Sequence, residues 1–177
     1  MDYSTLLLSA AFAVSQAAAP RPQSVNLRVS AQGTGHVAVS EHSWRVNASG
    51  FRRSDGGFHL SGTAGNASVS ISANAMGNGS SRSFSLFGSG VNANLSRSGS
   101  SWNLWGSVDG EHLNMHINPF GSGYNLWGLA GASLNAHKWA NEVTVSGSVD
   151  STRTSAKTLA LLGAALAAVS AEPSVNR

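Results

Sequence analysis

The chain contains no cysteine, and only 11% of its 177 residues are charged. Without cysteine there is no disulfide, no thiol nucleophile and no thiolate metal site, so packing and backbone hydrogen bonds must hold the fold. Lysine and arginine number 11 against 8 aspartates and glutamates, and they are dispersed along the chain. Nucleic-acid binding uses clustered cations beside stacking aromatics. The sequence therefore predicts no nucleic-acid partner.

Patterns that carry catalysis or metal binding are also scarce. The chain has no Gly-x-Ser-x-Gly motif, and Asp109 and Glu111 flank a hairpin tip, where nothing separates the pKa values of two carboxyls. His112 and His116 lie in an alternating segment, so their rings would stand about 13 Å apart along a strand. One metal ion binds ligands at about 2 Å. We predict no catalytic residues, no cofactor and no metal site, and a protein that is not an enzyme.

Residues 1–19 have the pattern of an export signal. A short apolar segment from Leu6 to Val14 precedes the small residues of "SQAAAP", although Asp2 stands where a basic residue is usual. An ordinary N-terminal helix is the alternative. The apolar segment is too short to span a bilayer. We therefore predict a secreted or cell-envelope protein.

Residues 20–150 alternate between apolar and polar side chains, with the period of two that is typical of β-strands. The stretch 58–73 contains two such runs around Gly65-Asn66, which indicates a β-hairpin. Related hairpins start at Phe84, Trp102 and Tyr124, and a half copy starts at Val143. Their shared pattern is a large apolar residue, Leu or Val two positions later, and then Gly.

The repeat is irregular in length. Its glycines, at positions 62, 88, 106, 128 and 147, are separated by 26, 18, 22 and 19 residues. A solenoid needs nearly constant rungs, whereas hairpin loops can vary in length. We predict an all-β antiparallel meander of about ten strands, closed as a barrel or folded as a sandwich. Each repeated glycine would mark a bulge, a bend or a ring lying over the backbone.

The tail, residues 151–177, lacks this alternation. Residues 158–169, rich in Ala and Leu, form a predicted apolar helix that ends before Pro173. A helix that is apolar on all sides must be buried. We predict that it caps one end of the sheet or fills the mouth of a barrel.

The parity of the repeat predicts an aromatic row. Phe87, Trp105 and Trp127 fall on the face that otherwise carries Ser, Asn, His and Arg. Such rings suit a sugar ring or a partner surface. Two structural alternatives are that they cover glycines of neighbouring strands or pack beneath the tail helix.

Three functions follow from these patterns. The first is an exported, non-enzymatic β-repeat protein of the cell surface or envelope, acting through surface contacts or by self-association along strand edges. The second is a soluble binding module that uses the aromatic row for a glycan or an apolar ligand. The third is a small outer-membrane barrel with an aromatic girdle, although the expected strands of seven to nine residues are shorter than the roughly nine to eleven of spanning strands.

Overall fold

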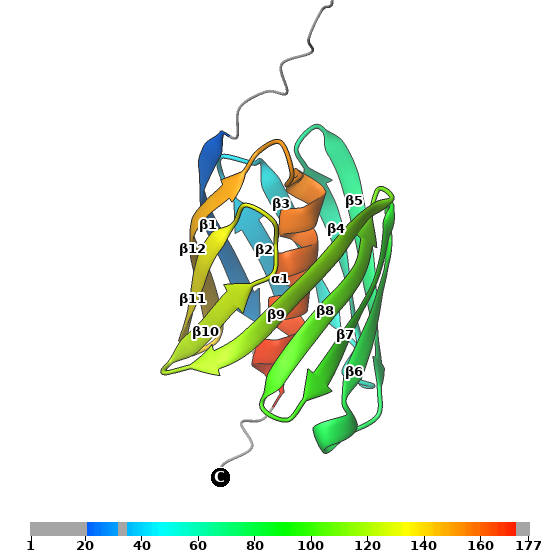
Figure 1. Ribbon diagram of the computed structural model, residues 1–177. Helices are drawn as coiled ribbons and strands as arrows, with labels where there is room; N and C mark the ends of the chain where they lie inside the picture. Colours follow the sequence, from blue (N-terminus) through cyan, green and yellow to red (C-terminus); the bar gives the residue numbers. More distant parts are fainter. Residues whose placement is uncertain (1–20, 32–34, 173–177) are drawn as a thin grey trace, which may run out of the picture.

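The computed structural model describes residues 21–31 and 35–172 (Figure 1). The predicted export signal lies outside the described residues. The elements are twelve strands, a 3-10 turn and one α-helix: β1 (Pro22–Ala31), β2 (His36–Glu41), β3 (Val46–Arg52), β4 (Phe58–Ala64), β5 (Ala67–Met76), η1 (Gly79–Ser81), β6 (Ser83–Gly88), β7 (Val91–Ser98), β8 (Ser101–Val108), β9 (Glu111–Phe120), β10 (Gly123–Trp127), β11 (Ser133–Trp139), β12 (Glu142–Asp150) and α1 (Ala156–Ala171).

The strands form a closed antiparallel barrel. Each strand pairs with its sequence neighbours, and β1 pairs with β12, with Pro22 opposite Asp150 and Ser30 opposite Glu142. The predicted all-β meander is confirmed, and of the two closures offered the barrel is found. The strands number twelve rather than about ten, because residues 36–52 form a hairpin that lacks the Leu-x-Gly pattern of the repeat.

The residue types in the two-residue turns determine where the chain forms hairpins. Asp109 and Gly110 both have positive φ, 51° and 86°, as a type I′ turn requires, and they join β8 to β9. Gly65 and Asn66 join β4 to β5 as the sequence predicted. The strand parity is confirmed as well, with Trp102, Leu104 and Val108 buried inside the barrel.

The repeated glycines allow the backbones of neighbouring strands to approach closely. At Gly106, φ is +150° and an added Cβ would stand 2.2 Å from the carbonyl oxygen of Asn92 on β7. At all five repeat glycines a Cβ would lie 2.0 to 2.6 Å from a backbone oxygen of another strand. Real Cβ atoms do not come so close to a carbonyl. The close approach of a neighbouring strand's backbone is therefore what requires glycine at these positions.

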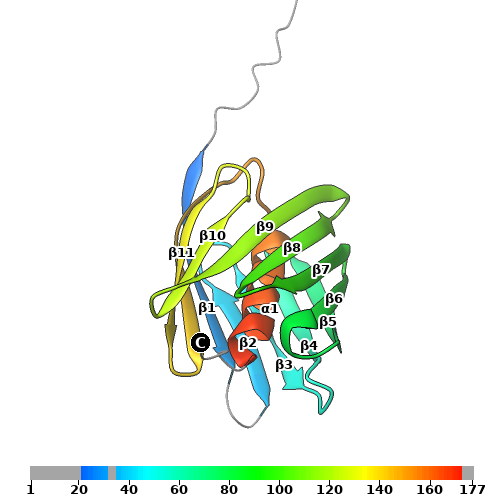
Figure 2. The ribbon, with the colours of Figure 1, turned by 60° about the horizontal axis from the view of Figure 1, so that its bottom comes forward.

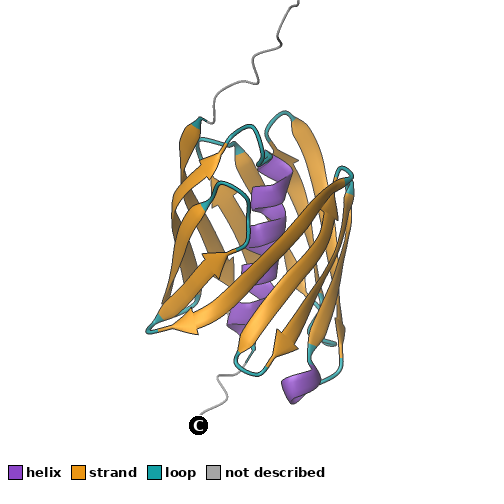
Figure 3. Cartoon of the chain, viewed as in Figure 1, coloured by secondary structure: helices purple, strands orange, loops and turns teal. Residues whose placement is uncertain are grey.

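Helix α1 runs through the interior of the barrel (Figures 2 and 3). Its residues from Thr158 to Val169 are all buried, and an added Cβ at Gly163 would lie 2.3 Å from Cγ1 of Val39 on β2. The prediction that the helix caps the sheet or fills only a mouth was wrong, because apolar inward side chains surround it along its length. It is also longer than the predicted 158–169. Among the described residues, no helix is long and apolar enough to cross a membrane.

Polar contacts hold both ends of α1. At its start, Ser155 Oγ accepts a hydrogen bond from the Thr158 amide at 3.1 Å, and Lys157 Nζ lies 2.8 Å from Asp109 Oδ1. At its end, Arg52 Nη2 donates to the carbonyl of Ala167 and Lys138 Nζ to that of Ser170, each at 3.0 Å.

Cations suit the last turn of a helix, where carbonyls lack helical partners. Arg82 Nε adds an ion pair with Glu172 Oε1 at 3.1 Å just beyond the helix. Burial lowers the pKa of Arg52, whereas Glu172 raises it. The helix is therefore fixed in the barrel by its apolar surface and by charge at both ends.

Candidate functional site

The three aromatic side chains singled out from the sequence are exposed on the outer wall. The exposed fractions are 42% for Phe87, 53% for Trp105 and 54% for Trp127. They belong to β6, β8 and β10, which are alternate strands of the wall. Because α1 lies inside the barrel, the alternative that these rings pack beneath the helix was wrong. We call the surface that carries these three rings the aromatic face.

Amide side chains lie between the rings. Trp105 is paired across the sheet with Asn94 on β7 and with Asn114 on β9. Rings on alternate strands are separated by two strand spacings, about 10 Å, and also by two residues along the strand, about 7 Å, because Trp105 is opposite Asn114 whereas Trp127 is opposite His116. A single sugar ring therefore contacts one aromatic side chain at a time, whereas an extended chain can contact several.

Trp127 is held in place by His116. The two rings are stacked, with centroids 3.9 Å apart and planes at 17°. The other side of the histidine is fixed as well, since its Nδ1 lies 2.5 Å from Oδ1 of Asn103. Asn103, His116 and Trp127 are successive cross-strand partners on β8, β9 and β10. One face of the indole is covered by the imidazole, and the ring presents its remaining surface to solvent in a fixed orientation.

A pocket of about 390 Å³ lies beside the first residues of β9, and its lining includes Gly106 and Gly128, which directly follow Trp105 and Trp127 in the chain. It arises because β10 ends at Trp127, opposite His116, so that the first residues of β9 have no partner on β10. The chain leaves the sheet after Trp127, and Gly128 and Ala130, which continue the alternation of the buried Tyr124 and Leu126, lie outside any strand. The lining combines apolar, amide, imidazole and guanidinium groups from Gly106, His112, Leu113, Asn114, Gly128, Leu129, Ala130 and Arg153.

The pocket is suited to a ligand with both apolar and hydroxyl surfaces. Leu113 and Leu129 supply apolar area, while His112 and Asn114 supply groups that donate and accept hydrogen bonds. Arg153 has an exposed side chain whose Nε is 3.9 Å from Asp150 Oδ2, so its guanidinium keeps free donors. Trp105 and Trp127 are the chain neighbours of the lining residues Gly106 and Gly128, whereas Phe87 lies on β6, beyond β7.

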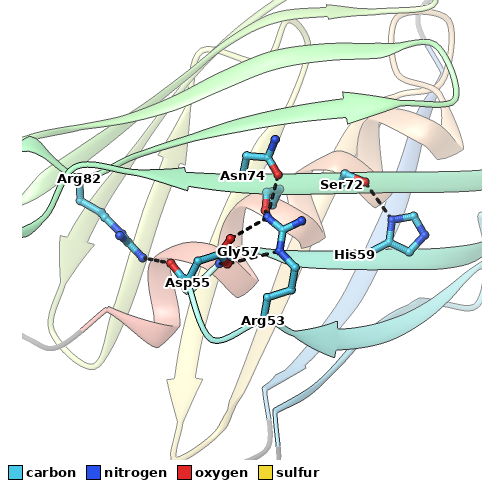
Figure 4. A network of polar contacts seen from close by, with 8 residues as sticks. Arg53, Asp55, Gly57, His59, Ser72, Asn74 and Arg82 are labelled. Carbon is cyan, nitrogen blue, oxygen red and sulfur yellow. Dashed lines mark hydrogen bonds and ion pairs between the residues drawn. The ribbon is translucent and has the colours of Figure 1, made fainter.

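A second polar cluster lies at the junction of β3, β4 and β5 (Figure 4). Arg53 Nη2 donates to Oδ1 of Asn74 at 2.7 Å, and Asp55 Oδ1 accepts from the Gly57 amide at 2.8 Å. That backbone hydrogen bond is the main reason that the pKa of Asp55 is lowered. His59 Nδ1 lies 2.9 Å from Ser72 Oγ.

This cluster does not have the geometry of a catalytic site. None of the hydrogen bonds of His59 goes to a carboxylate that would orient it as a base, and His59 is exposed on the wall. The cluster ties the loop between β3 and β4 to β5. In the described part of the chain, no three His, Asp or Glu side chains are arranged to hold a metal ion.

The sequence missed the pocket and the role of His116. Strand parity places His116 on the same face as Trp127, but which residues lie opposite each other depends on register. The pocket depends on the point at which β10 ends, and the alternation continues past that point in the sequence.

The chain was compared with protein-family models, curated proteins and solved structures, and no significant match was found. The site must therefore be judged from its own geometry.

Proposed function

We propose that the protein is a non-enzymatic binding protein whose aromatic face takes an extended carbohydrate. The observation that carries this proposal is the aromatic face itself, where Trp105 and Trp127 are exposed and each directly precedes a glycine that lines a pocket with amide and imidazole groups. The apolar faces of sugar rings stack on aromatic side chains, and their hydroxyls bond to amides. The row of rings on alternate strands favours an oligomer over a single sugar.

Substitution of Trp105 tests this function directly. Isothermal titration with a panel of soluble neutral and acidic oligosaccharides should identify a ligand whose binding Trp105→Ala reduces at least tenfold. Trp139→Ala is the matched control, because Trp139 is 83% exposed but lies at the end of β11. Circular dichroism should show both variants folded. Equal loss of affinity in both variants, or unfolding of Trp105→Ala alone, would contradict the proposal.

Ligand length gives a second test. Affinity for the ligand identified should increase as the oligosaccharide is lengthened from one ring to the next. Phe87→Ala should weaken only the longer ligands, because Phe87 lies beyond β7 from Trp105. An affinity that does not depend on length would limit the site to the pocket.

We also propose export to the cell surface or envelope, on the signal-like pattern of residues 1–19. Self-association by strand addition receives less support, because the twelve described strands pair in a closed ring and leave no complete edge strand.

An outer-membrane barrel would need an apolar outer wall and a polar interior. Here the interior is apolar, and Asn, Ser and His residues line much of the outer wall. We expect the purified protein to sediment as a monomer without detergent.

A further inference from the structure

Large exposed hydrophobic side chains gather at one end of the barrel. This is the end at which α1 finishes, drawn at the bottom of Figure 1, and we call it the lower end. The side chains and their exposed fractions are Phe51 67%, Met76 49%, Phe120 69% and Trp139 83%. We call these four residues the collar.

The collar is built by strand direction. Six strands run toward the lower end in the antiparallel ring, and three of them, β5, β9 and β11, end on Met76, Phe120 and Trp139. In β3, Phe51 is the residue before the last. Two of the six strands that run the other way carry an exposed large hydrophobic side chain near their last residue, Phe87 in β6 and Trp127 in β10. Exposed large hydrophobic side chains are thus more numerous at the lower end, with four against two.

Positive charge gathers at the same end. Counted over the described residues, the lower end carries five basic and three acidic side chains, a surplus of two: Arg52, Arg53, Arg82, Arg97 and Lys138 against Asp55, Glu142 and Glu172. The upper end is balanced at four of each: Arg21, Arg45, Arg153 and Lys157 against Glu41, Asp109, Glu111 and Asp150. The barrel is therefore polarised along its axis in both apolar exposure and charge.

The basic side chains of the lower end are held in place by hydrogen bonds and an ion pair within the protein. Arg52 and Lys138 bond to carbonyls of α1, and Arg97 Nε donates to the carbonyl of Gly99 at 3.0 Å. A hydrogen bond to a neutral carbonyl does not cancel the positive charge of the side chain. Arg53 has an ion pair with Asp55 at 3.3 Å, and its side chain remains 44% exposed.

We propose that the lower end of the barrel docks on an anionic membrane surface. The collar enters the headgroup region, and the basic surplus faces the lipid phosphates and carboxylates. Exposed aromatics combined with basic residues are the elements of interfacial binding. Two copies meeting end to end would bring two positive surfaces together, so charge favours a lipid surface over a second copy. This inference is independent of carbohydrate binding, which uses the outer wall.

Vesicle cosedimentation tests the proposal with the full chain. One set of vesicles is phosphatidylcholine alone, and the other contains about one third phosphatidylserine. We expect binding to the anionic vesicles to exceed binding to the neutral ones, and to weaken as salt is raised, because the attraction is screened. Equal binding to both sets, or binding to neither, would overturn the proposal.

Paired variants separate the collar from other exposed aromatics. Phe120→Ser combined with Trp139→Ser should lower vesicle affinity at least about tenfold, since two large apolar side chains leave the interface. Phe87→Ser combined with Trp105→Ser is the matched control, with two exposed aromatics on the wall, and should bind vesicles as the unsubstituted protein does. Equal loss in both pairs would contradict docking by the lower end.

A charge variant and a hydrodynamic measurement complete the test. Arg97→Gln should weaken binding to anionic vesicles about fivefold while leaving the thermal transition in place.

Sedimentation velocity without lipid should show a monomer. A dimer that the collar variant dissociates, in a protein that does not bind vesicles, would assign the collar to a second copy instead.

Discussion

The imidazole of His116 lies flat against the indole of Trp127, with the ring centroids 3.9 Å apart. The histidine is also held by Asn103, so the contact fixes an exposed tryptophan that directly precedes the pocket residue Gly128. An aromatic ring that is already ordered binds a ligand with less loss of side-chain entropy.

Removal of the imidazole should therefore weaken carbohydrate binding without unfolding the barrel. We expect His116→Ala to reduce the affinity for the identified oligosaccharide about threefold to tenfold, since one immobilised side chain is worth roughly 0.5–1.5 kcal/mol. Titration calorimetry measures this change. His137→Ala, on the exposed face of β11, is the control and should leave the affinity unchanged. Unaltered binding by His116→Ala would show that Trp127 does not need its stacking partner.

A methyl group at a repeat glycine should destabilise the barrel. Gly106→Ala places Cβ 2.2 Å from the Asn92 carbonyl oxygen, in backbone with φ of +150°. We expect a loss of at least about 2 kcal/mol in the free energy of unfolding, from strain and displaced strand pairing.

Gly99→Ala is the matched control for this effect. Gly99 also has positive φ, +63°, but an added Cβ would meet no atom within 4 Å. Its cost should be limited to about 1 kcal/mol of backbone strain. Urea denaturation of the two variants compares them, and an equal loss would show that close strand approach is not what requires glycine in the repeat.

Truncation of a leucine within α1 should cost as much as truncation in any protein core. Leu161 is fully buried inside the barrel. Leu161→Ala should lower the free energy of unfolding by about 2–5 kcal/mol, because the surrounding wall cannot collapse into the cavity. Leu129→Ala, at the partly exposed pocket, should cost less. A small effect at Leu161 in chemical denaturation would argue against a helix packed in the interior.

Acid should weaken the turn that leads from β12 into α1. Asp150 is buried, and its Oδ1 accepts hydrogen bonds from the Thr152 amide at 2.9 Å and from Thr152 Oγ1 at 2.7 Å. These bonds lower the pKa of the Asp150 carboxyl below its ordinary value. A lowered folded-state pKa stabilises the protein above the unfolded pKa, near 4, and this stabilisation is lost as pH falls toward the folded pKa.

The variant Asp150→Asn isolates that dependence. Near neutral pH it should be less stable than the unsubstituted protein, and the difference should shrink as the pH is lowered below about 4. Unfolding curves recorded across this range provide the measurement. A difference that stays constant with pH would show that the Asp150 carboxylate is not the titrating group.

The sequence predicted what depends on neighbouring residues. Period-two alternation indicated strands such as Phe58–Ala64 and placed Trp105 and Trp127 on the outer face, where the structure has them. The Asp109-Gly110 turn followed from its residue types. The uniform apolar character of residues 158–169 required burial from all sides.

Only the tertiary structure decided how these parts meet. The pairing of β1 with β12 closes the barrel, and it joins residues more than 110 positions apart in the chain. Closure in turn creates an interior that encloses α1 and leaves no end of the sheet for the helix to cap. The stack of His116 on Trp127, the pocket beside it and the collar at the lower end all depend on register and strand length. Alternation of apolar and polar residues indicates which face of the sheet a side chain occupies. Register and barrel closure are set by contacts between distant segments, so the sequence pattern alone did not reveal the register or the closure.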